Sequence, residues 1–173
     1  NSKYTEMPQC HILNDTDSII SVCKKVINLY NEKVISSISL DIESDYLHKE
    51  LDEGEEANKD LFDVNHTIVG FAISWDENFA VWFTLDHAES KVDIPKVVPY
   101  LKEMLELVPI EAHHGKYDQS WLKEKLGIST VLSFDTMLGS FALHGQSRSH
   151  GLKPLLRSVF SWPPYETHIA QEV

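Results

Sequence analysis

Two carboxylates stand two residues apart near the end of an apolar segment. The stretch Val34–Ile42 is rich in β-branched residues and carries no charge before Asp41, and Glu43 follows directly after it. In a β-strand, residues two apart project from the same face. Neighbouring carboxylates repel each other unless a cation lies between them. The spacing therefore favours a divalent-metal site, although acids at a strand end can also simply begin a loop.

A third acid, Asp118, follows another short apolar stretch. Val108–Ala112 predicts a strand, and a turn containing Gly115 leads into a helix that starts near Lys116. Asp118 then falls in the first helical turn, where the helix dipole favours a negative charge. Taken alone, this position indicates an acid that stabilises a helix start at least as well as a metal ligand.

A further segment, Phe134-Asp-Thr-Met-Leu138, is followed by Ser149-His-Gly-Leu152. Taken together, these segments resemble the proofreading exonuclease domain of family A DNA polymerases, of the bacterial polymerase I and phage type. Asp41-Ile-Glu43 is similar to that family's first motif. His114-Gly-Lys-Tyr-Asp118 is similar to its second, in which asparagine usually stands at the place of His114. The last two segments look like the helix pair that follows, which carries no metal. The resemblance spans roughly Cys10 to Phe160, and ribonuclease D and helicase-linked exonucleases share the first motifs.

The resemblance implies a ribonuclease-H-like α/β fold, in which helices flank a mixed five-stranded sheet, over one domain of residues 1–173. It also implies two Mg²⁺ or Mn²⁺ ions, about 4 Å apart, that grip the scissile phosphate. Oxygen ligands suit such cations. By resemblance, Asp41 bridges both ions, Glu43 binds one of them near the terminal 3′-hydroxyl, and Asp118 holds the second.

The family also has a fourth aspartate, on a later helix, with a tyrosine four residues before it. After Phe160 this sequence contains no aspartate, so Tyr165 begins no Tyr-x-x-x-Asp motif. We therefore expect a fragment of a larger polymerase that lacks the helix with the last motif. Such a fragment should bind metal weakly and cleave poorly.

Substrate contacts are expected near the second motif and between the last two helices. The candidate residues are His114, Lys116, Tyr117, Arg148 and His150. The alternative for each basic side chain is solvated surface charge. The expected partners are a single-stranded 3′ end of DNA, since terminal nucleotides must leave the duplex to reach the metals, and an attached or associated polymerase domain.

Two other groups of residues carry weaker alternatives. Adjacent histidines on a strand point to opposite faces, so His113 and His114 cannot readily share a zinc ion. We expect them to pack or to contact the edge of the substrate. Phe71, Trp75, Trp82 and Phe83 alternate along two predicted hairpin strands. We expect these four aromatic side chains to belong to the core rather than to stack on bases.

Hydrophobic periodicity and capping residues predict the elements that position these groups. The expected strands are 9–13, 34–42, 67–75, 79–85, 108–112 and 128–134, and the expected helices are 16–30, 93–107, 117–126, 135–143 and 152–160. Three early strands followed by alternating helices and strands indicate a mixed sheet. Residues 45–66, with eight acids and two lysines, are expected to be an acidic loop insertion.

The composition is that of a globular protein with an uneven charge. The net charge is −12, but residues 1–113 hold nine Lys/Arg and twenty-two Asp/Glu, whereas residues 114–173 hold six and five. The negative net charge argues against nucleic-acid binding. That argument is weaker for residues 114–173, because most of the acidic residues lie before them. No apolar run is long enough to span a membrane. Two cysteines are too few for a disulfide framework, which favours a reduced, cytosol-like compartment, with an organelle also possible.

Three functions are compatible with these features. The first is a metal-dependent 3′→5′ exonuclease that proofreads for a family A DNA polymerase. The second is an inactive exonuclease fold that serves as a scaffold, which the missing fourth ligand and the acidic surface favour. The third is a ribonuclease D-like enzyme that trims RNA 3′ ends.

Overall fold

The computed structural model describes residues 9–46, 61, 63–147 and 149–162. Their strands form one six-stranded sheet in the order β1-β4-β3-β2-β5-β6. The strands are β1 Gln9–Leu13, β2 Ile38–Tyr46, β3 His66–Asp76, β4 Phe79–Thr84, β5 Ile110–Ala112 and β6 Leu132–Asp135. Strand β3 runs antiparallel to both of its neighbours, and the other pairs are parallel. The mixed sheet is confirmed. It has six strands rather than the five that the resemblance implies, because β1 pairs with the outer edge of β4.

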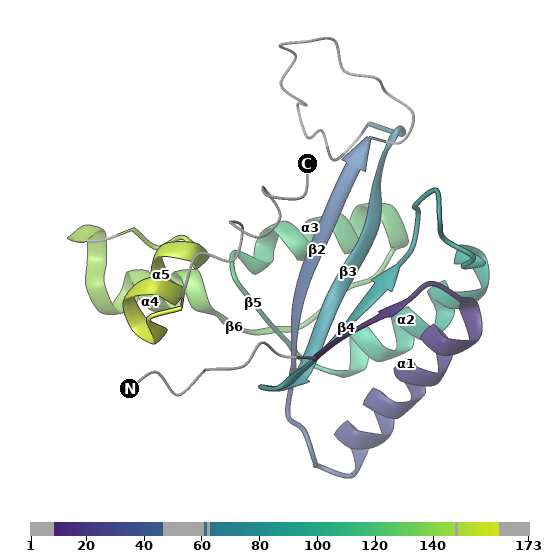
Figure 1. The fold of residues 1–173 in the computed structure, drawn as a ribbon, viewed down its shortest axis with the longest axis horizontal. Coiled ribbons are helices and arrows are strands. Elements are labelled where there is room, and N and C mark those ends of the chain that lie inside the picture. The colour runs from purple at the N-terminus through teal and green to yellow at the C-terminus, as the bar shows by residue number, and fades with distance from the viewer. Residues whose placement is uncertain (1–8, 47–60, 62, 148, 163–173) are drawn as a thin grey trace.

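Helices cover the sheet unevenly (Figure 1). They are α1 Thr16–Asn31, α2 Ile94–Leu107, α3 Gly115–Leu126, α4 Thr136–His144 and α5 Leu152–Phe160, with a short 3₁₀ turn η1 at Gly145–Ser147. Helices α1 and α2 pack side by side, and α3 lies behind β2. Helices α4 and α5 stand to one side, beyond the β6 edge of the sheet.

The core lies on the face of the sheet that α1, α2 and α3 cover. The buried residues of β2 alternate with exposed ones: Leu40 and Ile42 belong to the core, whereas Asp41 and Glu43 are exposed. Strands β3 and β4 continue the same layer through Phe71 and its partner Phe83. The other face of β2 therefore carries the carboxylates.

Local sequence sets several boundaries as predicted. Asp15 caps α1 by accepting a hydrogen bond from the Ser18 N–H at 2.9 Å, and Asp93 caps α2. The expected strand start at Val34 is wrong. Val34 is 64% exposed, and its N–H donates to the Leu29 carbonyl at the end of α1, so the strand begins at Ile38.

Helix α3 begins at Gly115, two residues before the expected start at Tyr117. Most of the expected acidic loop, 45–66, lies outside the described residues, although Asp45 and His66 belong to β2 and β3. Among the described residues, no helix is long and apolar enough to cross a membrane. Cys10 and Cys23 are both free thiols.

Candidate active site

The first two acids lie side by side on the open face of the sheet. Asp41 is opposite Ala72 of β3, and Glu43 is opposite Gly70. Neither of these small partners places a large side chain of its own beside a carboxylate. The acids were expected at the end of the strand, but β2 continues to Tyr46, so they lie in its middle. A backbone irregularity follows directly after Glu43.

The third acid approaches from α3 and meets the backbone between the other two. Strand β5 pairs with β2 only at Ile38 and Ser39, so the edge of β2 is free beyond that point. There the Ile42 N–H donates to Asp118 Oδ1 at 3.1 Å. Asp118 is 3% exposed. Its side chain therefore does more than stabilise the start of α3, because it joins that helix to the strand that carries Asp41 and Glu43.

Burial and mutual repulsion shift the pKa values of two of these acids. Burial first, and then the charge of Asp41, raises the pKa of Asp118 from 3.8 to about 7, while the Ile42 N–H opposes this shift. Burial and the neighbouring Glu43 also raise the pKa of Asp41. Among the described residues, no three His, Cys, Asp or Glu side chains lie close enough to form a ready metal site. The carboxylates are thus close enough to repel one another but are not arranged as a ligand set.

A fourth carboxylate, that of the buried Asp135, holds the turn before α3 in place. Asp135 lies at the end of β6 and is 7% exposed. It accepts four backbone N–H groups, and their donors, at 2.9–3.2 Å, are His114, Gly115, Met137 and Leu138. Burial alone would raise the pKa of Asp135, but the four donors together hold the pKa below its usual value. Asp135 thus fastens the first turns of α3 and α4 to each other.

Sequence reasoning missed this role of Asp135. The residue was noticed as part of the Phe-Asp-Thr-Met-Leu segment and as the start of the expected helix 135–143. Its place at a strand end, directly before a helix, is a recognisable N-cap signal for α4. Asp135 also accepts N–H groups at the start of a second helix, α3, which lies about twenty residues earlier in the chain. A local capping pattern does not reveal this second contact.

The turn 113–117 presents aromatic side chains next to the acids. His114 adopts a left-handed backbone conformation with φ 67°. The expectation that His113 and His114 lie on a strand and point to its opposite faces is therefore wrong. The His114 ring stacks on Tyr117 with centroids 6.4 Å apart. The Tyr117 hydroxyl lies 3.2 Å from the Ser44 hydroxyl, one residue beyond Glu43 on β2. Tyr117 thus lies beside the strand that carries the acids, with His114 next to it, whereas Lys116 is exposed and borders a separate pocket with Ser120 and Lys123.

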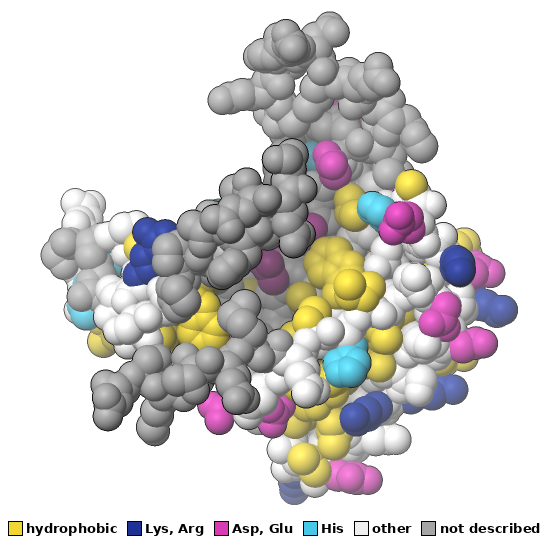
Figure 2. Space-filling model, viewed as in Figure 1, with side chains coloured by type: hydrophobic (Ala, Val, Ile, Leu, Met, Phe, Trp, Pro, Cys, Tyr) yellow, Lys and Arg dark blue, Asp and Glu magenta, His cyan; other side chains and the backbone are white. Residues whose placement is uncertain are grey.

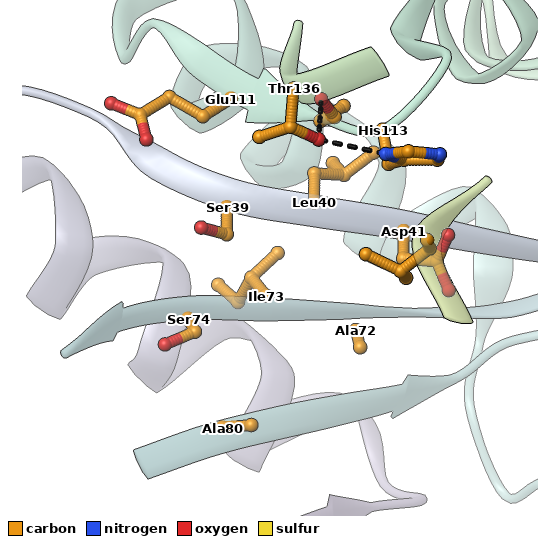
Figure 3. Close-up of a pocket in the computed structure, with 12 residues that line it drawn as sticks. Ser39, Leu40, Asp41, Ala72, Ile73, Ser74, Ala80, Glu111, His113 and Thr136 are labelled. Atoms are coloured by element: carbon orange, nitrogen blue, oxygen red, sulfur yellow. Dashed lines mark hydrogen bonds between the residues drawn. The ribbon is translucent and has the colours of Figure 1, made fainter. Parts of the chain in front are cut away.

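A groove of about 290 Å³ runs along the open face and includes Asp41 and His113. Both lie at the same end of the groove, whereas Glu111 lies toward the other (Figure 3). His113 Nδ1 is 2.9 Å from Thr136 Oγ1. Burial lowers the pKa of His113, while Asp135 and Asp41 oppose that shift. Figure 2 shows acidic side chains recessed in the hollow between the α4–α5 pair and the sheet.

Of the remaining expected substrate residues, His150 contacts His113 of the groove through its backbone. Both ring nitrogens of His150 have partners: Nδ1 is 2.9 Å from Ser140 Oγ, and Nε2 donates to the Gly145 carbonyl at 2.6 Å. His150 thus ties α4 to the turn before α5. Arg148 lies outside the described residues.

Comparisons with known proteins agree with this geometry. A sequence profile described as 3′–5′ exonuclease matches residues 10–172. No curated protein sequence matches the chain. Among solved structures, the catalytic core of RRP6 from Trypanosoma brucei has a TM-score of 0.62 at 16% identity, over 96% of this chain and 39% of that one.

Two further structures share the fold. Brucella melitensis NrnC with bound Mg²⁺ has a TM-score of 0.56 at 17% identity, over 97% of this chain and 69% of that one. RNase D of Escherichia coli, an exoribonuclease involved in structured RNA processing, has a TM-score of 0.59 at 13% identity, over 93% and 36%. The chain thus spans well under two thirds of the RRP6 and RNase D chains.

Proposed function

Because the chain belongs to the 3′–5′ exonuclease family, we propose that Asp41, Glu43 and Asp118 hold divalent metal ions for hydrolysis of the terminal phosphodiester of a nucleic-acid strand. The observation that carries this proposal is the convergence of α3 on the middle of β2. It brings Asp118 to the Ile42 N–H, between the two exposed acids. Residues 1–173 would form one exonuclease domain.

The three acidic side chains are suitable ligands for Mg²⁺ or Mn²⁺. All three side chains offer carboxylate oxygens, which hard divalent cations prefer. Burial, and after it the charge of a neighbouring acid, raises the pKa values of Asp118 and Asp41, so these two side chains would gain from a neutralising cation. Mg²⁺ or Mn²⁺, when bound, would activate a water and stabilise the leaving 3′ oxygen.

The protein's own groups supply the remaining parts of the mechanism. Asp41 and Glu43 would hold cations on the open face, and Asp118 would do so from α3. Lys116 and the aromatic pair His114 and Tyr117 would contact the strand next to the acids, as phosphate and base contacts respectively. Asp135 keeps this turn in position through its four backbone hydrogen bonds.

The test is cleavage of labelled single-stranded DNA and RNA with Mg²⁺ or Mn²⁺. Asp41→Ala should abolish 3′-end degradation. Glu77→Ala removes an exposed acid from the β3–β4 turn and should leave activity unchanged. If Asp41→Ala degrades the strand as fast as the unaltered chain, the assignment is wrong. If the unaltered chain neither cleaves nor shows Mn²⁺ binding by calorimetry, the fold serves as a scaffold instead.

For the substrate, we propose the single-stranded 3′ end of DNA, proofread for a covalently attached or associated family A polymerase. The ordered motifs around Asp41, Asp118 and Phe134–Leu138 support this choice. RNA trimming is the second candidate, and the similarity of the fold to RRP6 and RNase D supports it equally. Competition between DNA and RNA oligonucleotides of the same sequence separates the two: preferential cleavage of RNA would overturn the proofreading proposal.

A further inference from the structure

Trp82 occupies an unusual place among the aromatic side chains of the β3–β4 hairpin. Phe71 and Phe83 are fully buried, and Trp75 packs against the same core. Trp82, next to Phe83 in the chain, points to the opposite face and is not among the described side chains that pack on that core. The expectation that all four aromatic residues belong to the core is therefore wrong for Trp82.

The strand register places Trp82 on the same face as the acids. Asp41 is opposite Ala72, and Ala72 is opposite Trp82. Neighbouring strands lie about 4.8 Å apart, so the Cα atoms of Asp41 and Trp82 are roughly 10 Å apart. This is a distance that one nucleotide can bridge between its phosphate and its base.

The indole also leans toward Glu43. A Cβ atom built on Gly70 would lie 2.5 Å from Cζ2 and 2.9 Å from Cε2 of Trp82, so the ring system covers Gly70. Gly70 is the residue opposite Glu43. The indole therefore covers the backbone of the residue paired with Glu43, and the glycine is what permits it to lie there.

A pocket of about 330 Å³ adjoins the indole. Ile12 and Val69 contribute apolar walls, and the polar side chains of the lining are Asn14, Thr84, His87 and Glu89. A flat aromatic ring with apolar walls and a few polar groups suits a heterocyclic base, whose faces are apolar and whose edges form hydrogen bonds.

We propose that Trp82 is the stacking platform for a nucleobase within the last two nucleotides of the strand whose phosphodiester lies over Asp41 and Glu43. This inference rests on the proposed function and adds a base-recognition subsite to it. Aromatic stacking recognises any base, so the subsite would fix the position of the 3′ end without selecting a sequence.

The test compares oligonucleotides that keep the backbone but lack one base. Two probes carry an abasic site at the terminal or the penultimate position, and binding is measured in EDTA with fluorescent labels, so that no cleavage occurs. The unaltered chain should bind at least one abasic probe on the order of 10- to 100-fold more weakly than the complete strand. Trp82→Leu, which keeps an apolar side chain but no aromatic face, should lose this preference, and Trp82→Phe should retain most of it.

Trp75→Leu is the matched control. Trp75 lies on the same hairpin but on the core face, 5.1 Å from the Phe79 ring and beneath Lys25. It should keep the preference for complete strands. A ratio between two probes does not depend on the folded fraction of a variant, so partial unfolding cannot imitate the expected result.

The outcomes separate the two proposals. If Trp82→Leu discriminates between complete and abasic strands as well as the unaltered chain does, Trp82 is not a platform, whatever the cleavage assay shows. If Asp41→Ala still cleaves while Trp82→Leu loses discrimination, the subsite stands and the assignment of the metal ligands fails. If the unaltered chain binds no oligonucleotide in EDTA, the platform proposal fails, while the assignment of the metal ligands still depends on the cleavage assay.

Discussion

Replacing Asp118 by asparagine tests the electrostatics of the site directly. Burial and the charge of Asp41 raise the pKa of Asp118 from 3.8 to about 7. Because this pKa is higher in the folded protein than in the unfolded chain, the folded state binds more protons between these values. The unfolding free energy therefore falls as the pH rises from about 4 to about 7. Raising this pKa from 3.8 to about 7 corresponds to roughly 4 kcal/mol, which is an upper bound on what the ionised side chain costs above pH 7.

Asparagine removes the charge and keeps an oxygen that can accept the Ile42 N–H. Without metal, we expect Asp118→Asn to raise the unfolding free energy by about 2–4 kcal/mol near pH 8, and by about 1 kcal/mol or less near pH 4. Urea denaturation in EDTA at both pH values measures this difference. Glu124→Gln, which removes an exposed acid from the same helix, should change stability little at either pH.

Adding Mn²⁺ should narrow the difference in stability between the two proteins near pH 8. A ligand that binds only the folded state stabilises it, so the unaltered chain should gain stability while Asp118→Asn gains less. The reasoning fails if Asp118→Asn is no more stable than the unaltered chain near pH 8. It also fails if the gain is equal at both pH values, because the effect would then have nothing to do with ionisation.

Three further changes test the parts that support the site. Asp135→Asn replaces one acceptor oxygen by a donor and should lower the unfolding free energy by about 1–3 kcal/mol in urea; because the pKa of Asp135 is lowered, this deficit should shrink in acid. Gly115→Ala places a Cβ 2.7 Å from Leu132 Cδ1 and should cost about 1–3 kcal/mol by thermal denaturation. His150→Ala removes the ties to Ser140 and Gly145, so hydrogen exchange should accelerate in α5 and stay unchanged in β2. Unaltered exchange in α5 would show that these ties do not hold the helix pair.

Much of the local structure followed from sequence patterns that act over a few residues. Alternation along β2 put Asp41 and Glu43 on one face and Leu40 and Ile42 on the other, because neighbouring side chains of a strand point in opposite directions. Asp15 and Asp93 marked helix starts for an equally local reason, since a side chain caps an N–H two or three residues ahead. The exact strand limits did not follow, because α1 extends its hydrogen bonding as far as Val34.

The tertiary structure decided which distant groups meet. Asp118 is 76 residues from Ile42 in the chain. It can accept the Ile42 N–H because β5 pairs with β2 only at Ile38 and Ser39, which leaves the edge of β2 free at Ile42. The face to which Trp82 points relative to Asp41 depends on the register of three strands, and a shift of one residue would reverse it. The sequence by itself thus determined the chemistry and the local face of each acid, because those depend on residue type and strand period. Their convergence, with Asp135 at two helix starts and an indole over Gly70, required the packed fold, because long-range packing and register are not encoded in any short stretch of chain.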